Sequence, residues 1–274
     1  MGKALLDIII VNYNTADFIG ISLYALKKLT RNSYQVFIRD NNSKLEDYLK
    51  LKKIVKNYNN VFLERVRTKL GGSMAHGTAL NALVKKVDTP YFSILDADAI
   101  WLKKNWDQIL ISKINNKVKA IGTQASGNKP QDFPLMYAIL FETKAFNELG
   151  INFRPADVVK LQDTGYELRE KYLRVGYRGI NLEMRNTRVY KKGLFKDLMV
   201  AEYYLGKGHY LFASHFGRGS TLGANKHLGA SKRYLYRVPV LGRHFLYKKG
   251  KREKEKWIRI CKEIVDKQIS YAKI

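Results

Sequence analysis

Asp96 and Asp98, two aspartates separated by one residue, have the type and spacing that metal chemistry requires. They directly follow Phe92-Ser93-Ile94-Leu95, an apolar run that predicts a buried strand, so both carboxylates should project from a strand end. Oxygen ligands of this kind suit Mg²⁺ or Mn²⁺, which proteins commonly share between carboxylates and substrate phosphates. The pair therefore indicates a metal site for a diphosphate-bearing molecule, and a solvated turn is the alternative interpretation.

The elements that position these carboxylates are expected to alternate between strands and helices. Leu5–Val11 is apolar without alternation, which predicts a strand buried on both faces, and Ala16–Leu29 repeats its apolar residues at the helical period. Further strands are expected at Tyr34–Ile38, Val61–Val66 and Tyr91–Leu95, and helices at Glu46–Tyr58 and Met74–Val87. This order predicts an α/β fold, a doubly wound and mostly parallel sheet flanked by helices, whose ligand crevice lies at the carboxyl ends of the strands. Asp40 and Asp96 both fall there.

The second half of the chain is less regular. It suggests a strand at Leu135–Phe141, helices at Thr143–Leu149 and Thr164–Val175, and a late strand at Tyr210–Ala213. From Ser231 the sequence becomes basic and aromatic. It ends in a helical pattern that places one set of apolar residues on one face: Trp257, Cys261, Ile264, Val265 and Ile269. We expect one catalytic domain, residues 1–230, followed by a basic C-terminal helical extension, residues 231–274.

Several motifs, taken in order, resemble the family 2 glycosyltransferases with the GT-A fold over about Leu6 to Ser220. Ile10-Val11-Asn12-Tyr13-Asn14 is similar to the family's first strand and nucleotide-contacting loop, and Arg39-Asp40-Asn41-Asn42-Ser43 to the end of its second strand. Asp96-Ala97-Asp98 stands at the metal motif. Leu161–Leu168 resembles the segment that supplies the general base, and His215–Ser220 resembles a late histidine-containing loop. The resemblance implies a GT-A-like, inverting glycosyltransferase with a nucleotide-sugar half at about residues 1–100 and an acceptor half at about 101–230.

Carried over residue by residue, the resemblance implies that Asp40 hydrogen-bonds the base of a nucleotide-diphosphate sugar donor. Asp96 is expected near the ribose, Asp98 on the Mn²⁺ or Mg²⁺ ion, and His215 as a further metal ligand or a phosphate contact. The donor-binding set comprises Val11, Asn12, Tyr13, Asp40, Lys69, Gly72, Asp96 and Ala97. The alternatives are an ordinary turn at Asp40–Ser43 and a structural histidine at position 215.

Lys69-Leu70-Gly71-Gly72-Ser73 departs from the family, which usually has an Asn-x-Gly loop packing near the nucleotide. Glycines at a helix start let backbone N–H groups approach a phosphate, and for this reason Lys69 and Gly72 are candidate donor contacts. A hinge or a simple cap explains the two glycines equally well.

Gln162-Asp163 stands where the family commonly has Glu-Asp, so one carboxylate remains. Direct displacement at the anomeric carbon needs one base within about 3 Å of the acceptor hydroxyl. Asp163 is therefore the expected catalytic base, with Glu167 and Asp157 as the next candidates, and neighbouring apolar surface is expected to raise its pKa. The alternative is that Asp163 caps the helix expected at Thr164–Val175.

The charge of the chain indicates an anionic partner. Lys and Arg number 50 against 24 Asp and Glu, a formal net charge of +26. Basic residues contribute about 1 kcal/mol each near an anionic surface. We therefore expect Arg233–Trp257 to dock on an anionic membrane and the acceptor to be a glycan or a lipid-linked molecule. The alternative is that the Lys-rich helix packs on the catalytic domain.

Cys261 is the only cysteine, which excludes an internal disulfide and favours a reducing cytoplasm. Leu5–Val11 is far shorter than the roughly 20 apolar residues of a membrane-spanning helix, and no other run approaches that length. A cytoplasmic location, peripheral on the inner face of the membrane, is expected.

Two other classes of protein fit part of the sequence. A nucleotidyltransferase shares the α/β architecture and the acidic metal site, but Asn12-Tyr13-Asn14-Thr15 lacks the glycine-rich phosphate loop that such an enzyme usually needs. A nucleic-acid-binding protein explains the positive charge most directly. The acidic pair and the absence of a recognised basic helix or finger pattern argue against it, and no specific nucleic acid partner is expected.

Overall fold

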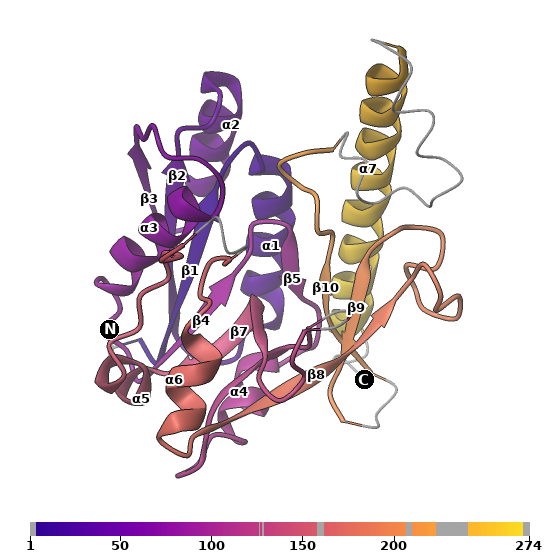
Figure 1. Ribbon diagram of the computed structural model, residues 1–274. Helices are drawn as coiled ribbons and strands as arrows, with labels where there is room; N and C mark the ends of the chain where they lie inside the picture. The colour runs from indigo at the N-terminus through magenta and orange to yellow at the C-terminus, as the bar shows by residue number, and fades with distance from the viewer. Residues whose placement is uncertain are drawn as a thin grey trace.

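The computed structural model describes residues 4–125, 127, 129–157, 162–206, 210–222 and 241–270. Three parts of the sequence predictions lie outside these residues. They are Leu161 of the expected general-base segment, residues 233–240 of the expected membrane-docking segment, and the side chain of Ile269. Within those ranges, ten strands form one sheet in the order β3-β2-β1-β4-β7-β6-β8-β9-β10-β5. Figure 1 shows this sheet running through the middle of the molecule with helices packed on it.

The N-terminal half is the strand and helix alternation that the sequence predicts. Its four parallel strands are β1 (Leu6–Asn12), β2 (Tyr34–Asn41), β3 (Val61–Val66) and β4 (Tyr91–Leu95). The helices between them are α1 (Ala16–Leu29), α2 (Leu45–Val55) and α3 (Gly72–Val84). Helices α2 and α3 end three residues before their predicted ends, because the backbone hydrogen bonds there join residues three apart and form turns.

The second half is mixed and contains elements that the sequence did not predict. The expected elements are β7 (Leu135–Glu142), α5 (Thr143–Glu148) and β10 (Leu211–His215). The additional ones are β5 (Ala99–Trp101), α4 (Trp106–Ile111), β6 (Val118–Thr123), β8 (Arg178–Asn186) and β9 (Ala201–Tyr204). Strand β5 is three residues long, and β8 is only partly buried and carries charged residues, so neither produces an apolar run.

Helix α6 (Leu168–Arg174) begins four residues later than predicted. Gly165 has a φ of +71°, a left-handed conformation that interrupts a helix. The segment from Asp163 to Glu167 therefore forms turns, in which Tyr166 N–H donates to the Asp163 carbonyl and Leu168 N–H to the Gly165 carbonyl.

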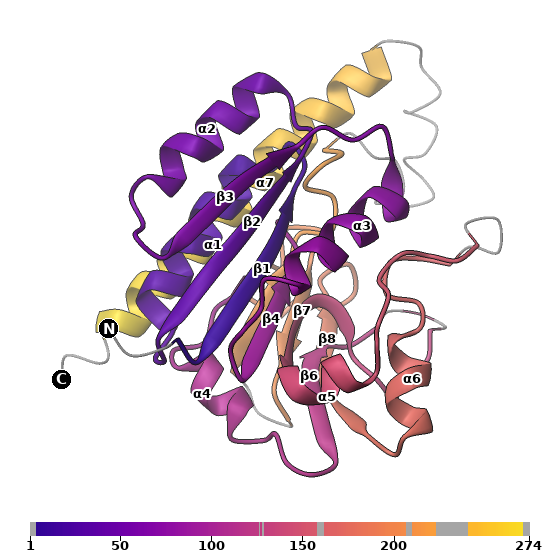
Figure 2. The same cartoon turned by 90° about the vertical axis from the view of Figure 1, so that its left-hand side faces the viewer.

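Two hydrophobic clusters cover the two faces of the sheet. Ile8 and Ile10 of β1 belong to the cluster under α1, whereas Ile9 belongs to the cluster under α3, as expected for alternating side chains on one strand. Figure 2 shows α1 and α2 on one side of the parallel strands and α3 on the other. Burial on both faces explains why β1 reads as a continuous apolar run.

The predicted C-terminal helix is present as α7 (Leu241–Ser270), and it packs against α1 and the sheet. Trp257, Cys261 and Val265 are fully buried in the same cluster as α1. The indole N–H of Trp257 donates to Ser214 Oγ over 3.0 Å, next to the end of β10. Figure 1 shows α7 standing beside β9 and β10.

Candidate active site

Two carboxylates and one imidazole meet at the carboxyl end of β4. Asp96 and Asp98 follow β4 directly, and His215 is the last residue of β10, which pairs with β5. His215 Nε2 lies 3.3 Å from Asp98 Oδ1 and 3.9 Å from Asp96 Oδ2. One ligand atom from each of the three residues lies within 4.8 Å of the others, so the group could hold a metal ion.

The backbone of the loop after β10 fixes the Asp98 carboxylate. Asp98 Oδ2 accepts hydrogen bonds from the N–H groups of Arg218 (2.9 Å) and Gly219 (2.7 Å). A Cβ atom at Gly219 would lie 2.7 Å from Asp98 Cβ, so only glycine allows this approach without a shift. The loop thereby directs Asp98 Oδ1 toward His215 and preorganises the carboxylate for a ligand.

The two aspartates have opposite pKa shifts. Burial raises the pKa of Asp96 to about 7, because the nearby His215 charge only partly offsets the loss of solvent. Burial also acts on Asp98, but the charge of His215 and the hydrogen bonds from His215, Gly219 and Arg218 outweigh it and lower the pKa of Asp98 to about 2. Asp98 is therefore ionised at neutral pH, while Asp96 is close to its titration midpoint.

Tyr137 of β7 contacts both His215 and Asp96. Its ring stacks on the His215 imidazole with the centroids 4.3 Å apart, and its carbonyl accepts the Asp96 N–H over 2.8 Å. Burial raises the pKa of Tyr137 to about 12, so the phenol stays neutral. The stacked ring restricts the imidazole to one plane.

One face of α3 links these residues to Asp163. Ser73 and His76 lie three residues apart and so share a face of the helix. His76 Nε2 is 3.9 Å from Asp96 Oδ1, and Ser73 Oγ donates to Asp163 Oδ1 over 2.6 Å. Gly77 permits close packing of α3 on the segment before Asp163, since a Cβ atom there would lie 2.6 Å from the Phe153 carbonyl oxygen.

The structure excludes the alternative interpretation of Asp163 and corrects the expected direction of its pKa shift. It is not the cap of α6, because the residue preceding that helix is Glu167 and Asp163 Oδ1 instead accepts the N–H of Thr164 over 2.8 Å. The pKa of Asp163 is lowered, not raised. Burial by itself would raise this pKa, but the hydrogen bonds from Ser73 and Thr164 outweigh the effect of burial. Asp163 is therefore an ionised carboxylate that can accept a proton.

Of the two alternative bases, Glu167 is engaged elsewhere. Glu167 Oε1 accepts the N–H of Asn152 over 2.5 Å and lies 2.8 Å from Lys171 Nζ. Asp157 belongs to the segment before Asp163, where its N–H donates to Gln162 Oε1 over 2.7 Å.

Asn12 and Asp40 form a second, fully buried polar cluster at the ends of β1 and β2. They are register partners on the two strands, and Asn12 Nδ2 donates to Asp40 Oδ2 over 2.7 Å. Arg65 Nε of β3 lies 3.3 Å from Asp40 Oδ1, and Ser43 Oγ accepts from Asn12 Nδ2 over 3.1 Å. Both side chains thus hold the β1 and β2 loops together, and neither is exposed to solvent.

The remaining expected donor contacts differ in their exposure. Tyr13 is 52% exposed, Lys69 and Gly72 are exposed, Val11 is partly buried and Ala97 is buried. Gly72 is the first residue of α3 and has a φ of +54°, which favours glycine. Because Gly72 precedes Ser73, the start of α3 connects the expected donor loop to Asp163.

Sequence reasoning missed four residues at the site: Ser73, His76, Tyr137 and Arg218. A signal existed for three of them, since Ser73 directly follows Gly72, His76 comes one helical turn later, and Arg218 lies within the His215–Ser220 motif. Tyr137 makes its contacts through its carbonyl group and ring stacking, which no local motif reveals.

Comparison with protein families identifies the class of protein. Residues 7–173, more than half of the chain, match the Glycosyl transferase family 2 profile. The chain belongs to this family, and its sheet and flanking helices have the GT-A architecture that the sequence predicted.

Two solved structures are similar to this chain at low sequence identity. The mannosyltransferase PcManGT from Pyrobaculum calidifontis, in complex with GDP-Man and Mn²⁺, is 18% identical with a TM-score of 0.52, over 66% of this chain and 55% of that one. A fragment of S. aureus TarS in complex with UDP-GlcNAc is 15% identical with a TM-score of 0.47, over 88% of this chain and 72% of that one. The chain thus spans about half the length of the mannosyltransferase. A search of curated protein sequences gave no match.

None of the helices in the described part of the chain combines the length and the apolar character that crossing a bilayer requires.

Proposed function

We propose that this protein is a metal-dependent, inverting glycosyltransferase that moves a sugar from a nucleotide-diphosphate sugar to an acceptor hydroxyl. The observation that carries the proposal is the convergence of Asp96, Asp98 and His215 at the carboxyl end of β4, with the Asp163 carboxylate joined to the same crevice through α3. Ligands of α/β sheets bind at this edge.

The side chains fit a divalent cation such as Mn²⁺ or Mg²⁺. Two carboxylates and an imidazole are suitable ligands, and the Asp98 carboxylate is already oriented by two backbone N–H groups. Asp98 and His215 would hold the ion, and Asp96 lies close enough to join them or to contact the ribose. When bound, the ion supplies positive charge against the diphosphate of the leaving nucleotide.

Asp163 is the proposed base. Its ionised carboxylate would take the proton of the acceptor hydroxyl as that oxygen attacks the anomeric carbon from the face opposite the nucleotide, which inverts the configuration. Ser73 and the Thr164 N–H position the carboxylate through Oδ1, leaving Oδ2 for the acceptor.

The donor is proposed to bind over the loops that follow β1, β2, β3 and β4, within residues 1–100, with the acceptor bound mainly by residues 101–230. Tyr13, Lys69 and Gly72 are exposed there and can reach a ligand directly. Val11, Asn12, Asp40 and Ala97 shape the same region. The buried Asn12–Asp40 pair would contact the base only at its inner edge or through the loops that it holds.

A thermal-shift panel tests the proposal. UDP-, GDP- and dTDP-sugars are each added with and without Mn²⁺, because a ligand that binds the native state raises its apparent stability. We expect one nucleotide class to raise the melting temperature, and to do so more strongly with Mn²⁺. If none of the three raises it under either condition, the proposed donor class is wrong.

We further propose that the protein docks on an anionic membrane through the first half of α7, and that its acceptor is a glycan or a lipid-linked molecule. Phe245 and Tyr247 are 57% and 54% exposed there, beside the exposed basic residues Lys248, Lys251 and Arg252. Aromatic and basic side chains on one helix suit an anionic interface.

Co-sedimentation with phosphatidylserine vesicles tests the docking. The double variant Phe245→Ser with Tyr247→Ser should bind less than the parent, and binding of the parent should weaken at high salt. The matched control is Leu45→Ser with Leu49→Ser on α2, which removes two similarly exposed apolar side chains. Equal sedimentation of the parent and the α7 variant would contradict the proposal.

A further inference from the structure

A cavity of about 690 Å³ lies away from the metal-binding group. It opens between the segment after β5, the start of β10, the β8–β9 connection and α7. Lys103 follows the end of β5, whereas Asp98 precedes its start, and Leu211 and His215 stand at opposite ends of β10. The four residue steps along β10 from Leu211 to His215 therefore separate the cavity from the metal-binding group by roughly 13 Å. The cavity is therefore distinct from the proposed transfer site.

The lining of this cavity is basic and aromatic. Its twelve residues include Lys103, Lys104, Arg185 and Lys192 and contain no carboxylate. Arg185 donates to Glu183 Oε1, but within the described part of the chain no ion pair involves any of the three lysines. Three unneutralised cations facing one hollow attract a compact anion.

Three tyrosines, Tyr190, Tyr204 and Tyr210, also line the cavity. Arg185 lies over the rings of Tyr204 (4.2 Å to the centroid) and Tyr190 (5.1 Å), and Lys103 Nζ lies 4.3 Å from the ring centroid of Tyr210. Tyr210 is 70% exposed, so its ring is accessible to a ligand. Flat apolar faces beside fixed cations suit a ligand with an apolar ring face and a negative group.

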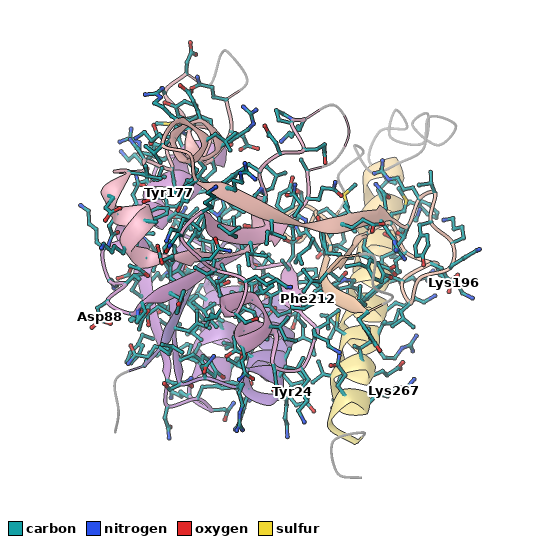
Figure 3. The ribbon with its side chains drawn as sticks, turned by 90° about the horizontal axis from the view of Figure 1, so that it is seen from below. Tyr24, Asp88, Tyr177, Lys196, Phe212 and Lys267 are labelled. Carbon is teal, nitrogen blue, oxygen red and sulfur yellow. The ribbon has the colours of Figure 1, made fainter. Side chains whose placement is uncertain are left out.

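The wall is also rigid. Glu202, buried behind it, accepts the Tyr204 hydroxyl over 2.6 Å and the Phe195 N–H over 2.8 Å. A Cβ atom at Gly193 would lie 1.9 Å from Glu202 Oε2, so this position requires glycine. On the opposite wall, Gln268 of α7 accepts the Lys104 N–H over 2.7 Å. Figure 3 shows that the β8–β9 connection, marked by Lys196, and the end of α7, marked by Lys267, lie on the same side of the molecule.

We propose that this cavity is a second binding site, for an anionic carbohydrate such as a sugar phosphate or a phosphate-bearing unit of a glycan. The lysines bind the phosphate and the tyrosines pack against the sugar ring. A lipid surface fits less well, because the cations line a hollow rather than a projecting face. The proposal does not depend on the transfer reaction.

The test measures binding of glucose 6-phosphate by ligand-observed NMR titration, with EDTA present so that the metal-binding group plays no part. Glucose and inorganic phosphate are the comparison probes. The double variant Lys104→Gln with Lys192→Gln should weaken binding of glucose 6-phosphate by at least about tenfold, because it loses two charged contacts. Tyr210→Ala should weaken glucose 6-phosphate more than inorganic phosphate.

The matched control is Lys52→Gln with Lys53→Gln, which removes the same charge from exposed positions on α2. Retained affinity in this control supports a local site, and a loss equal to that of the cavity variant shows general attraction and overturns the proposal. Equal affinity for glucose and glucose 6-phosphate, or an unaffected Lys104→Gln, Lys192→Gln variant, also overturns it. Unchanged Mn²⁺-dependent binding of nucleotide-sugar to the cavity variant would show that the transfer site is separate.

Discussion

Asp98 uses its two carboxylate oxygens for different purposes. Oδ2 is saturated by the N–H groups of Arg218 and Gly219, and Oδ1 faces His215 and Asp96. Burial, together with the nearby negative charge of Asp98, raises the pKa of the neighbouring Asp96, so its proton is retained to a much higher pH. Two aspartates separated by one residue are thus chemically unequal.

This inequality predicts a pH dependence of metal affinity. The pKa of Asp96 is raised from its ordinary value near 3.8 to about 7 in the folded protein, so below pH 7 an ion held by Asp96 must displace a proton. Mn²⁺ affinity should rise with pH up to about 7 and then level off, changing by up to about tenfold per pH unit below that point. Calorimetric titration at several pH values measures this. Asp96→Asn should make the profile shallower, because His215 must still lose its proton to bind the ion, and a flat profile in the parent would exclude Asp96 as a ligand.

Asp163→Asn tests the proposed base. Asparagine keeps an oxygen to accept from Ser73 and Thr164, so the loop should keep its shape, but the amide cannot take a proton at neutral pH. Transfer should fall by roughly 10² to 10⁴, mainly in kcat, while donor affinity is retained. The matched variant Glu167→Gln should stay nearly normal in kcat. If instead Asp163→Asn is nearly normal and Glu167→Gln is not, the base has been assigned to the wrong residue.

At the scale of elements, short loops between strands determine the geometry of the site. The loop after β10 reaches Asp98, and the start of α3 reaches Asp163, although neither contact is close in sequence. Glycines make both approaches possible, because Gly219 meets Asp98 and Gly77 meets the Phe153 backbone at distances that exclude a side chain. Close approach of the backbone at these glycines therefore fixes the positions of Asp98 and Asp163.

Gly219→Ala tests the role of the loop after β10. The added methyl group would lie 2.7 Å from Asp98 Cβ, so the loop must move and at least one N–H bond to Asp98 must lengthen. We expect Mn²⁺ affinity to fall by about tenfold or more while the protein stays folded, since a hydrogen bond to a charged group contributes about 1.5 to 3 kcal/mol. The control Gly20→Ala on α1, where the nearest atom is the flexible end of Ile54 at 3.3 Å, should leave Mn²⁺ affinity unchanged. Parental affinity in Gly219→Ala would show that these N–H groups do not orient the ligand.

At the scale of the whole molecule, α7 joins the C-terminal end of the chain to the first helix and to the metal-binding region. Trp257 packs against Phe18 of α1 and Phe216 beside His215, with centroids 5.5 Å and 6.0 Å apart. Lys254 of α7 forms an ion pair with Asp17 of α1 over 2.7 Å. Helix α7 therefore contributes to the core that supports the site.

Trp257→Ala should destabilise the protein by about 3 to 5 kcal/mol, because it opens a cavity in this core and leaves Ser214 without its donor. Urea denaturation followed by circular dichroism measures the change. Trp257→Phe should lose less, because most of the buried ring remains. A loss below about 1 kcal/mol for the alanine variant would mean that α7 adds little to the core. The deletion of residues 231–274 should then also fold, whereas we expect it to unfold the domain.

The sequence by itself determined the features that depend on residues close to one another in the chain. The buried runs of β1 and β4 and the helical period of α1 predict parallel strands with Asp96 and Asp98 at a strand end, because burial on both faces leaves a local apolar pattern. The apolar face of α7 could be predicted for the same reason. The order of the motifs was sufficient to indicate the family, which the match over residues 7–173 confirms.

Only the tertiary structure decided how these residues act together. The proximity of His215 to Asp98, the contact of Ser73 with Asp163 and the burial of Asp40 depend on packing between elements that are distant in the chain. The pKa shifts follow from that packing, so the expected rise at Asp163 became a lowering once hydrogen bonds from Ser73 and Thr164 were present. A local pattern can place a carboxylate at a strand end, but desolvation and hydrogen bonding, which set its charge, are properties of the assembled fold.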